Sequence, residues 1–194
     1  SAGLDIDLEA FARAAIANYG ALITSPESKL EDILNFFNDR HDAMLREKGY
    51  AYDHVAAALA VHGKRPQLLM RCLDAMKQLQ NGSVQDLAEQ AKRMQRIVKE
   101  PSHSIDAALL KDDEKDFFAI ANASAGAVKD HMARYAFDDA IKEVVGWLPT
   151  ISSYFEAVLV NDSDTKKRQN RHALVKSVLD SMQLVADFTR IEKK

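Results

Sequence analysis

Apolar residues recur at intervals of three and four along most of the chain, the spacing that places side chains on one face of an α-helix. The pattern is clear between Leu30 and Leu45, and a wider apolar face follows between Leu174 and Phe188. No stretch alternates apolar and polar residues in the way that marks a β-strand. The sequence therefore predicts an all-α fold, a bundle of roughly eight or nine helices.

Scarce glycines and prolines mark where the predicted helices start and stop. We expect helices over residues 4–23, 26–49, 53–63, 66–81, 83–100, 113–135 and 165–188, a short one over 105–110, and a helical segment over 138–160 that breaks near Trp147. Ser83 with Asp86 resembles a capping box, and Asp164 is placed to cap the last helix. These elements predict a helical lead-in, residues 1–80, packed on a bundle formed by residues 81–194.

Composition is that of a globular protein, with 47% hydrophobic and 28% charged residues. The lone Cys72 cannot form an internal disulfide and is expected in the core, as a reducing cytoplasm allows. No run of apolar residues is long enough to span a membrane, and no signal peptide is visible, so we expect a soluble cytoplasmic protein. The opening Ser1 to Gly3 carries no apolar pattern and is expected to be left from expression, on a piece of something larger.

The net charge of −3 hides an uneven distribution. Residues 1–61 and 101–160 each carry a balance of −5, whereas residues 62–100 carry +4 and residues 161–194 carry +3. Folding that brought the two basic segments onto one face would create a surface for a polyanion.

Signatures of catalysis are missing from the sequence. The glycines form no phosphate-binding loop, and the histidines form neither an HExxH pair nor a di-iron pattern. The pairs His41-Asp42 and Asp130-His131 are too short to indicate a phosphohydrolase, and we interpret them as helix-surface residues. We therefore expect a noncatalytic chain with no metal and no cofactor of its own.

Two groups of basic residues are candidates for phosphate contacts. Lys92, Arg93, Arg96 and Lys99 lie at spacings that let most of them share one helix face, which is either a binding surface or merely a solvated one. Lys166, Lys167, Arg168 and Arg171 crowd the start of the last helix, where positive charge opposes the macrodipole and a phosphate would relieve the conflict. Arg171 also admits a structural interpretation, in which it pairs with a buried acid on another element.

Aromatic residues have their own alternatives. Tyr50, Tyr52 and Tyr135 lie near predicted helix ends, either as ordinary exposed residues or as platforms for unpaired bases. The doubled aromatics Phe36-Phe37 and Tyr154-Phe155 are expected in the core.

Residues 149–194 resemble the end of bacterial glycyl-tRNA synthetase beta subunits. The similar stretches are YFEAVLV at 154–160, the acidic turn with Asp162 and Asp164, RQNRH at 168–172 and VADFTRI at 185–191. Weaker similarity continues upstream in FFNDR at 36–40, GYAYD at 49–53, ALAV at 58–61, Arg65-Pro66 and AKRMQRIV at 91–98. Arg96, His172 and Thr189 depart from the family pattern of Asn, Leu and Ser, which puts local hydrogen bonds in doubt.

The resemblance implies an anticodon-binding helical domain of the type named after a DALR sequence, which this chain does not carry. It implies a noncatalytic module that contacts glycine tRNA, attached to an enzyme that joins glycine to that tRNA with ATP and magnesium in a separate alpha subunit. Partners are then glycine tRNA and the alpha subunit, with no DNA and no membrane. The expected RNA-binding residues are Arg65, Lys92, Arg93, Arg96, Lys99, Lys166, Lys167, Arg168 and Arg171. The alternative is a helical docking module for subunit assembly that does not touch RNA.

Overall fold

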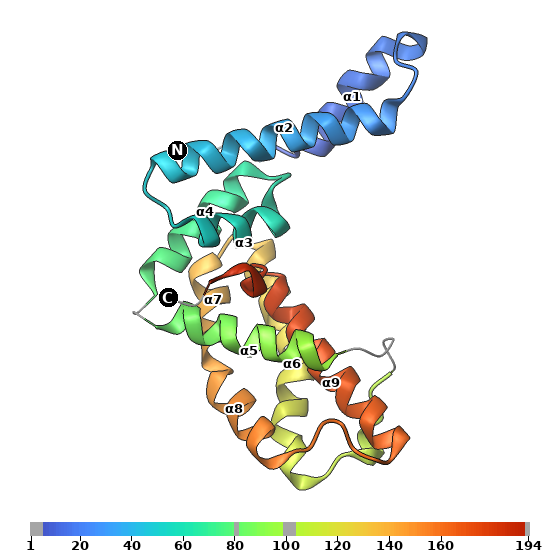
Figure 1. The fold of residues 1–194 in the computed structure, drawn as a ribbon, viewed down its shortest axis with the longest axis vertical. Coiled ribbons are helices and arrows are strands. Elements are labelled where there is room, and N and C mark those ends of the chain that lie inside the picture. Colours follow the sequence, from blue (N-terminus) through green and yellow to red (C-terminus); the bar gives the residue numbers. More distant parts are fainter. Residues whose placement is uncertain (1–5, 80–81, 99–103, 193–194) are drawn as a thin grey trace.

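The structure, a computed structural model, describes residues 6–79, 82–98 and 104–192 and is built from helices (Figure 1). The α-helices in these ranges are α1 (Leu8–Tyr19), α2 (Pro26–Glu47), α3 (Tyr52–His62), α4 (Pro66–Gln78), α5 (Ser83–Ile97), α6 (Lys115–Ala133), α7 (Phe137–Gly146), α8 (Leu148–Ala157) and α9 (Thr165–Gln183). Short 3-10 turns are η1 (Gly20–Leu22), η2 (Ala107–Leu109), η3 (Asp112–Glu114) and η4 (Phe188–Arg190). No strand occurs in the described ranges, so the predicted all-α class is confirmed.

Local chemistry sets the ends of the first helices. The Asp7 carboxylate accepts a hydrogen bond from the backbone N–H of Ala10 at 3.0 Å, so α1 begins at Leu8 rather than at the predicted residue 4. Gly20 ends α1 at a φ of +51°, a conformation that glycine adopts readily and that residues with a Cβ atom disfavour. Pro26 begins α2, where its missing N–H costs no helical hydrogen bond, as the sequence predicted.

The capping box predicted at Ser83 is wrong. Ser83 is the first helical residue of α5, and Gly82 precedes it at a φ of +102° with no side-chain cap. Because a capping side chain must belong to the residue before the helix, the Ser83 hydroxyl stands one position too late.

Two other boundary predictions are confirmed. The helical segment after residue 137 breaks at Trp147, which separates α7 from α8. The Asp164 carboxylate caps α9 by accepting hydrogen bonds from the backbone N–H groups of Lys166 at 2.9 Å and Lys167 at 3.3 Å.

One continuous hydrophobic core joins α3 to α9 and the C-terminal turn η4. At its centre the Phe117 and Tyr154 rings stack with centroids 3.9 Å apart, and Phe155 packs edge-on against both. The predicted core positions of Tyr154 and Phe155 are confirmed. Phe36 was predicted in the core and is 56% exposed, because α2 packs chiefly on α1 and α3 and leaves one face to solvent.

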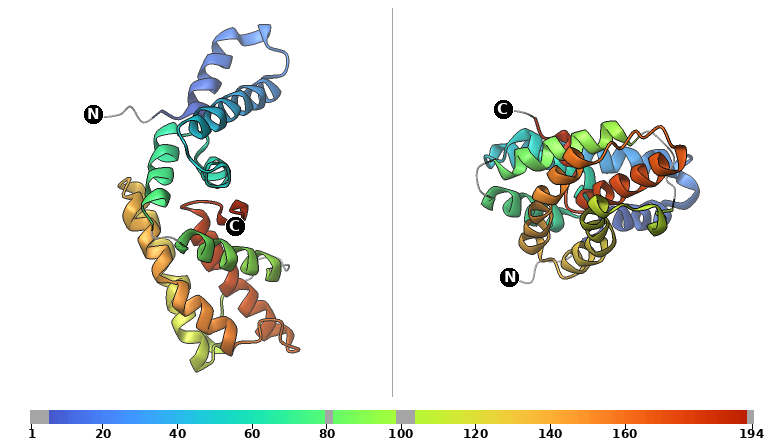
Figure 2. Two further views of the ribbon diagram at one scale, coloured as in Figure 1. Left: turned by 60° about the vertical axis from the view of Figure 1, so that its left-hand side comes forward. Right: turned by 90° about the horizontal axis from the view of Figure 1, so that it is seen from below.

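Helices α1 and α2 form an arm that projects from this bundle (Figures 1 and 2). The arm has a small buried cluster of its own, made by Ala12, Ile16 and Leu30. On the surface of the arm, Arg13 of α1 pairs with Glu27 of α2 at 2.8 Å. Since α3 and α4 share the main core, the division of the chain at residue 80 stays a prediction.

The C-terminal segment ties the bundle together after α9. The Val185 carbonyl accepts hydrogen bonds from His62 Nε2 at 2.8 Å and from Cys72 Sγ at 3.3 Å. Seven residues further on, the backbone N–H of Glu192 donates to the buried Asp53 carboxylate at 3.1 Å. The segment thus joins α3 and α4 to η4, which lies against α5.

Candidate nucleic-acid interface

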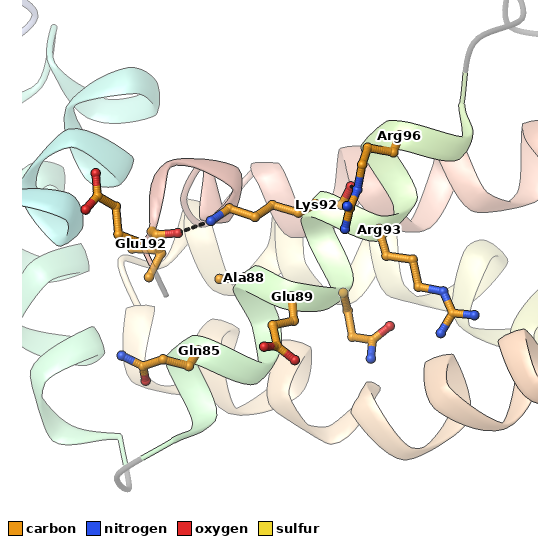
Figure 3. Close-up of a pocket in the computed structure, with 9 residues that line it drawn as sticks. Gln85, Ala88, Glu89, Lys92, Arg93, Arg96 and Glu192 are labelled. Carbon is orange, nitrogen blue, oxygen red and sulfur yellow. Dashed lines mark hydrogen bonds between the residues drawn. The ribbon is translucent and has the colours of Figure 1, made fainter. Parts of the chain in front are cut away.

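One face of α5 borders a groove of about 510 Å³, shown in Figure 3. Residues three and four apart on this helix line it, because that spacing brings side chains to the same face. The lining residues are Gln85, Ala88, Glu89, Gln90, Lys92, Arg93 and Arg96 from α5, with Ile191 and Glu192 from the C-terminal segment. The buried Ala88 and Ile191 supply apolar surface, and charged side chains surround it.

Lys92 is partly buried and serves the fold. Its ammonium group donates a hydrogen bond to the backbone carbonyl of Ile191 (Figure 3). This contact fixes the C-terminal segment against α5 and directs the Lys92 charge to the Glu192 end of the groove. Lys92 therefore holds one wall of the groove in place, whereas Arg93 and Arg96 beside it are exposed.

Arg93 presents an exposed guanidinium group at the other end of the groove. Its Cζ lies 4.3 Å from the centroid of the Phe155 ring, and Nη2 donates to the Phe155 carbonyl at 3.4 Å. A guanidinium stacked on an aromatic ring is held in place while its outer edge can still donate hydrogen bonds. Arg93 is thus positioned in advance of any ligand.

Arg96 lies one turn further along the same face and is also exposed. Its Nε donates to the Lys92 carbonyl at 3.2 Å, and its terminal nitrogens make no ion pair with the described residues. Cations near the C-terminal end of a helix are stabilised by the macrodipole, so this position needs no ligand to be tolerated. Lys99, predicted on the same face, lies outside the described residues.

The basic cluster at the start of α9 differs from what its sequence predicts. Asp164 accepts hydrogen bonds from two backbone N–H groups of the first turn, and its other oxygen lies 3.7 Å from Lys167 Nζ. Arg168 Nη1 donates to the Asp162 carbonyl at 3.0 Å. The acidic turn thus offsets the clash between positive charge and macrodipole, which removes the reason to expect a phosphate here.

The position of Arg171 differs from the prediction that this residue contacts RNA. Its guanidinium is 5% exposed and donates to Glu114 at 2.5 Å and to Asp162 at 2.7 Å. The geometry favours the structural interpretation, in which Arg171 pairs with a buried acid on another element. That acid is Glu114 of η3. A guanidinium enclosed in this way is not accessible to RNA.

The remaining predicted contact, Arg65, lies at the base of the arm. It is the residue before α4. Its Nε lies 3.9 Å from the carboxylate of Asp7, the residue that caps α1. Among the predicted RNA-binding residues, the structure gathers Lys92, Arg93 and Arg96 on one face. The start of α9 lies at the lower end of the bundle in Figure 1 and in the left view of Figure 2, whereas α5 crosses its middle.

The tyrosines singled out as stacking platforms have internal contacts. Tyr50 donates its hydroxyl to Asp74 at 2.5 Å, and this hydrogen bond, followed by burial, raises the pKa of Tyr50. A hydrogen bond with Glu192 raises the pKa of the exposed Tyr52 to about 12. Tyr135 adopts a φ of +58° and its ring centroid lies 5.7 Å from Arg71 Cζ.

Sequence reasoning missed the acidic and amide residues of the groove, Gln85, Glu89, Gln90 and Glu192. The first three belong to the same helical repeat as the predicted arginines, so the spacing was available as a signal. Glu192 reaches the groove only through the tertiary position of the C-terminal segment.

No set of three or more His, Cys, Asp or Glu side chains in the described ranges is arranged to hold a metal ion. No helix in those ranges combines the length and apolarity needed to cross a membrane.

The fold and this groove define an all-helical module with a cationic helix face. No family model matches the chain. The chain is similar to the glycine–tRNA ligase beta subunit of Aromatoleum aromaticum, with 30% identity over 193 residues, which cover 97% of this chain and 28% of that protein. It is 28% identical over 196 residues to the subunit of the same name from Clostridioides difficile, again covering 97% of this chain and 28% of that protein. With the Paracoccus denitrificans subunit the identity is 27% over 180 residues. The chain thus spans little more than a quarter of the length of these curated relatives.

Proposed function

We propose that this chain is a noncatalytic tRNA-binding module of a glycyl-tRNA synthetase beta subunit, and that it contacts the tRNA backbone through Arg93 and Arg96. Similarity along 97% of the chain to glycine–tRNA ligase beta subunits supports a role in glycyl-tRNA synthesis. The anticodon arm is the part of the tRNA that we propose it contacts. Glycine attachment itself, with ATP and magnesium, is assigned by this proposal to the alpha subunit.

The observation that carries the proposal is the state of the two guanidinium groups. Both are exposed on one face of α5, and their hydrogen bonds go to backbone carbonyls. Neither forms an ion pair with a carboxylate among the residues that the structure describes. Arginine at such a site offers paired N–H groups that match the geometry of a phosphate.

The proposal is tested by binding of purified glycine tRNA over a salt series. Counterion release predicts that with two phosphate contacts, one from each arginine, the affinity falls about tenfold between 50 and 200 mM salt. Arg96→Glu should weaken binding and reduce the slope of log affinity against log salt by about one. Lys29→Glu, on the arm, reverses an exposed charge far from the groove and should leave the slope unchanged.

Either of two results would overturn the proposal. Affinity that does not depend on salt, or that Arg96→Glu and Lys29→Glu reduce equally, would remove the α5 face from RNA contact. Circular dichroism of both variants confirms that the helices are intact, since each substituted side chain is exposed.

The alternative function, docking for subunit assembly, is favoured by one separate observation. Phe11 and Tyr19 on α1 and Leu22 on η1 are 68%, 62% and 84% exposed. Exposed apolar side chains concentrated in this way indicate a protein contact, and the relatives' designation as a beta subunit makes the alpha subunit the partner to test. Capture of the alpha subunit by this chain, lost in Phe11→Ser with Leu22→Ser and accompanied by no tRNA binding, would support docking over RNA recognition.

A further inference from the structure

Exposed apolar side chains gather on and beside the arm formed by α1 and α2. Among the described residues, nine large hydrophobic side chains stay exposed, and six of them lie within residues 6–44: Ile6, Phe11, Tyr19, Leu22, Phe36 and Met44. The other three are spread over the much longer remainder of the chain: Tyr52, Val61 and Leu159. Single exposed apolar residues are ordinary on a protein surface, whereas a concentration of them indicates a contact. A contact is therefore expected on the arm.

The apolar stripe of α1 continues past the residues that α2 covers. Leu8, Ala12 and Ile16 follow one another at four-residue spacing on one face of α1 and are buried. Tyr19 comes three residues after Ile16 and so continues the same face, yet it is exposed. Leu22 follows on η1 and is the most exposed of these side chains. An apolar stripe that outruns its cover predicts a further surface packed on its end.

The bundle does not supply that surface in the described part of the chain. The arm joins the bundle at its base, where the Leu8 N–H donates to the Lys64 carbonyl at 2.8 Å and Glu9 pairs with Lys64 at 2.5 Å. The tip of the arm, residues 19–25 around η1, lies at the end of the arm away from the bundle (Figure 1 and the left view of Figure 2). A surface that covers the tip therefore belongs to another part of an assembly.

Charged side chains next to the tip are already paired with each other. Arg13 pairs with Glu27 at 2.8 Å, and Lys29 pairs with Asp32 at 3.0 Å. The tip thus offers apolar surface and little unbalanced charge, so its partner is an apolar protein surface. Contact of this kind should depend little on salt, because salt screens charges and not apolar burial.

The size of the apolar patch favours a neighbour in the same polypeptide over a separate protein. Phe11, Tyr19 and Leu22 together offer roughly 400 Å², taking about 200 Å² for a large apolar side chain. A stable interface between separate proteins takes about 800 Å² from each partner. Interfaces between domains of one chain begin at about 300 Å² a side, and a covalent link lets a smaller contact suffice by raising the effective concentration. Such a neighbour exists in the curated relatives, of whose length this chain covers 28%.

We infer that the tip of the arm packs on an apolar surface of the remaining part of the beta subunit, within the same polypeptide. The inference rests on the part of the proposed function that places this chain in a beta subunit, and it does not depend on RNA contact. The packing buries Phe11, Tyr19 and Leu22 and sets the direction in which the arm carries the bundle. The alpha subunit and a second copy of this chain are rival occupants that the experiment separates.

Ala21→Cys places a thiol on η1 and leaves the three apolar side chains intact. Ala21 is exposed, whereas the native Cys72 is buried and its thiol pKa is raised to about 12, so Cys72 does not compete for reagent. Maleimide labelling at residue 21, read by peptide mass spectrometry, is compared between this chain and the intact beta subunit without its alpha subunit. The rate should be at least about tenfold lower in the beta subunit, at low and at high salt, because labelling requires the contact to open.

Phe11→Ser with Leu22→Ser, added to Ala21→Cys in the beta subunit, should return the labelling rate to that of this chain. Both side chains are exposed in this chain, so circular dichroism should show intact helices. Ala157→Cys is the matched control, an exposed alanine at the end of α8. Its labelling rate in the beta subunit should not respond to the two serines, because it lies outside the arm.

Equal rates at residue 21 in this chain and in the beta subunit, or protection that survives the two serines, would overturn the inference. Protection that appears only after the alpha subunit is added would assign the tip to that subunit. Protection that rises with protein concentration would assign it to a second copy, and both results contradict packing within the beta subunit. Failure of glycine tRNA to bind would overturn the proposed RNA contact while leaving these labelling rates as expected, so the two proposals fail separately.

Discussion

Arg171 on α9 donates from Nε to the Glu114 carboxylate across 2.5 Å, and both side chains are buried. The same guanidinium donates from Nη1 to the Leu159 carbonyl at 2.9 Å and to Asp162 at 2.7 Å. Glu114 Oε2 in turn accepts from the backbone N–H of Lys111 at 2.7 Å. This network fixes the loop before α9 and the turn before α6 against each other, so one buried guanidinium joins residues that are distant in sequence.

Glu114→Gln should lower the free energy of unfolding by about 3 kcal/mol, because it removes the fully buried one of the two carboxylates that face the Arg171 charge and leaves only the partly exposed Asp162. Urea denaturation followed by circular dichroism measures the change. Asp116→Asn, which removes an exposed carboxylate nearby, should have little effect. Equal midpoints for the two variants would show that the pair contributes nothing beyond surface charge.

Tyr154→Phe should raise the free energy of unfolding by about 1 kcal/mol. The Tyr154 hydroxyl is buried with no hydrogen-bond partner among the described residues, so its removal ends an unfavourable desolvation while the ring keeps its stack on Phe117. Thermal or urea unfolding checks this, with Tyr19→Phe on the exposed surface as the control. A loss of stability in Tyr154→Phe would show that the hydroxyl makes a favourable contact.

Stability should fall as the pH drops below about 6.5, the ordinary pKa of histidine. Burial lowers the pKa of His62 in the folded chain, against a weaker opposing effect of its hydrogen bond to Val185. The unfolded chain therefore binds a proton at His62 before the folded chain does, and acid favours unfolding until the folded-state pKa is passed. The contribution of His62 is fully present above pH 6.5 and is lost below it.

His62→Gln isolates this effect from the other histidines. Urea midpoints measured between pH 7.5 and 5.5 should decline less steeply in the variant than in the wild type. Parallel declines in the two proteins would mean that His62 does not couple protonation to folding.

Cys72 should resist thiol reagents in the folded chain. Burial raises the pKa of the Cys72 thiol to about 12, so almost no reactive thiolate exists near neutral pH. Labelling with a chromogenic disulfide should be slow in buffer and fast in denaturing urea. Rapid labelling of one thiol per chain in buffer would show that α4 opens well below the global unfolding free energy.

Several features of the fold were predictable because short-range chemistry decides them. Asp164 caps α9 through the backbone of the next three residues, and Pro26 begins α2. The break at Trp147 follows from the residues beside it. Phe36 was misplaced because the helical period shows that a face is apolar, and only the packing of α2 shows whether a neighbour covers that face.

The candidate site was predictable in part. Spacing alone placed Lys92, Arg93 and Arg96 on one helix face, and the structure shows that face beside a groove. Arg93 is exposed and stacks on the Phe155 ring, whereas Arg171 is enclosed by carboxylates, and nothing in the neighbouring sequence distinguishes the two.

By itself the sequence determined the helical class, most helix boundaries and the positions of the basic residues, because each depends on side chains within a few positions of one another. The tertiary structure alone decided that Glu114 would neutralise Arg171 and that Glu192 would complete the groove. Those outcomes depend on segments that meet only after the chain has packed, where burial and charge pairing set which groups remain available to a partner.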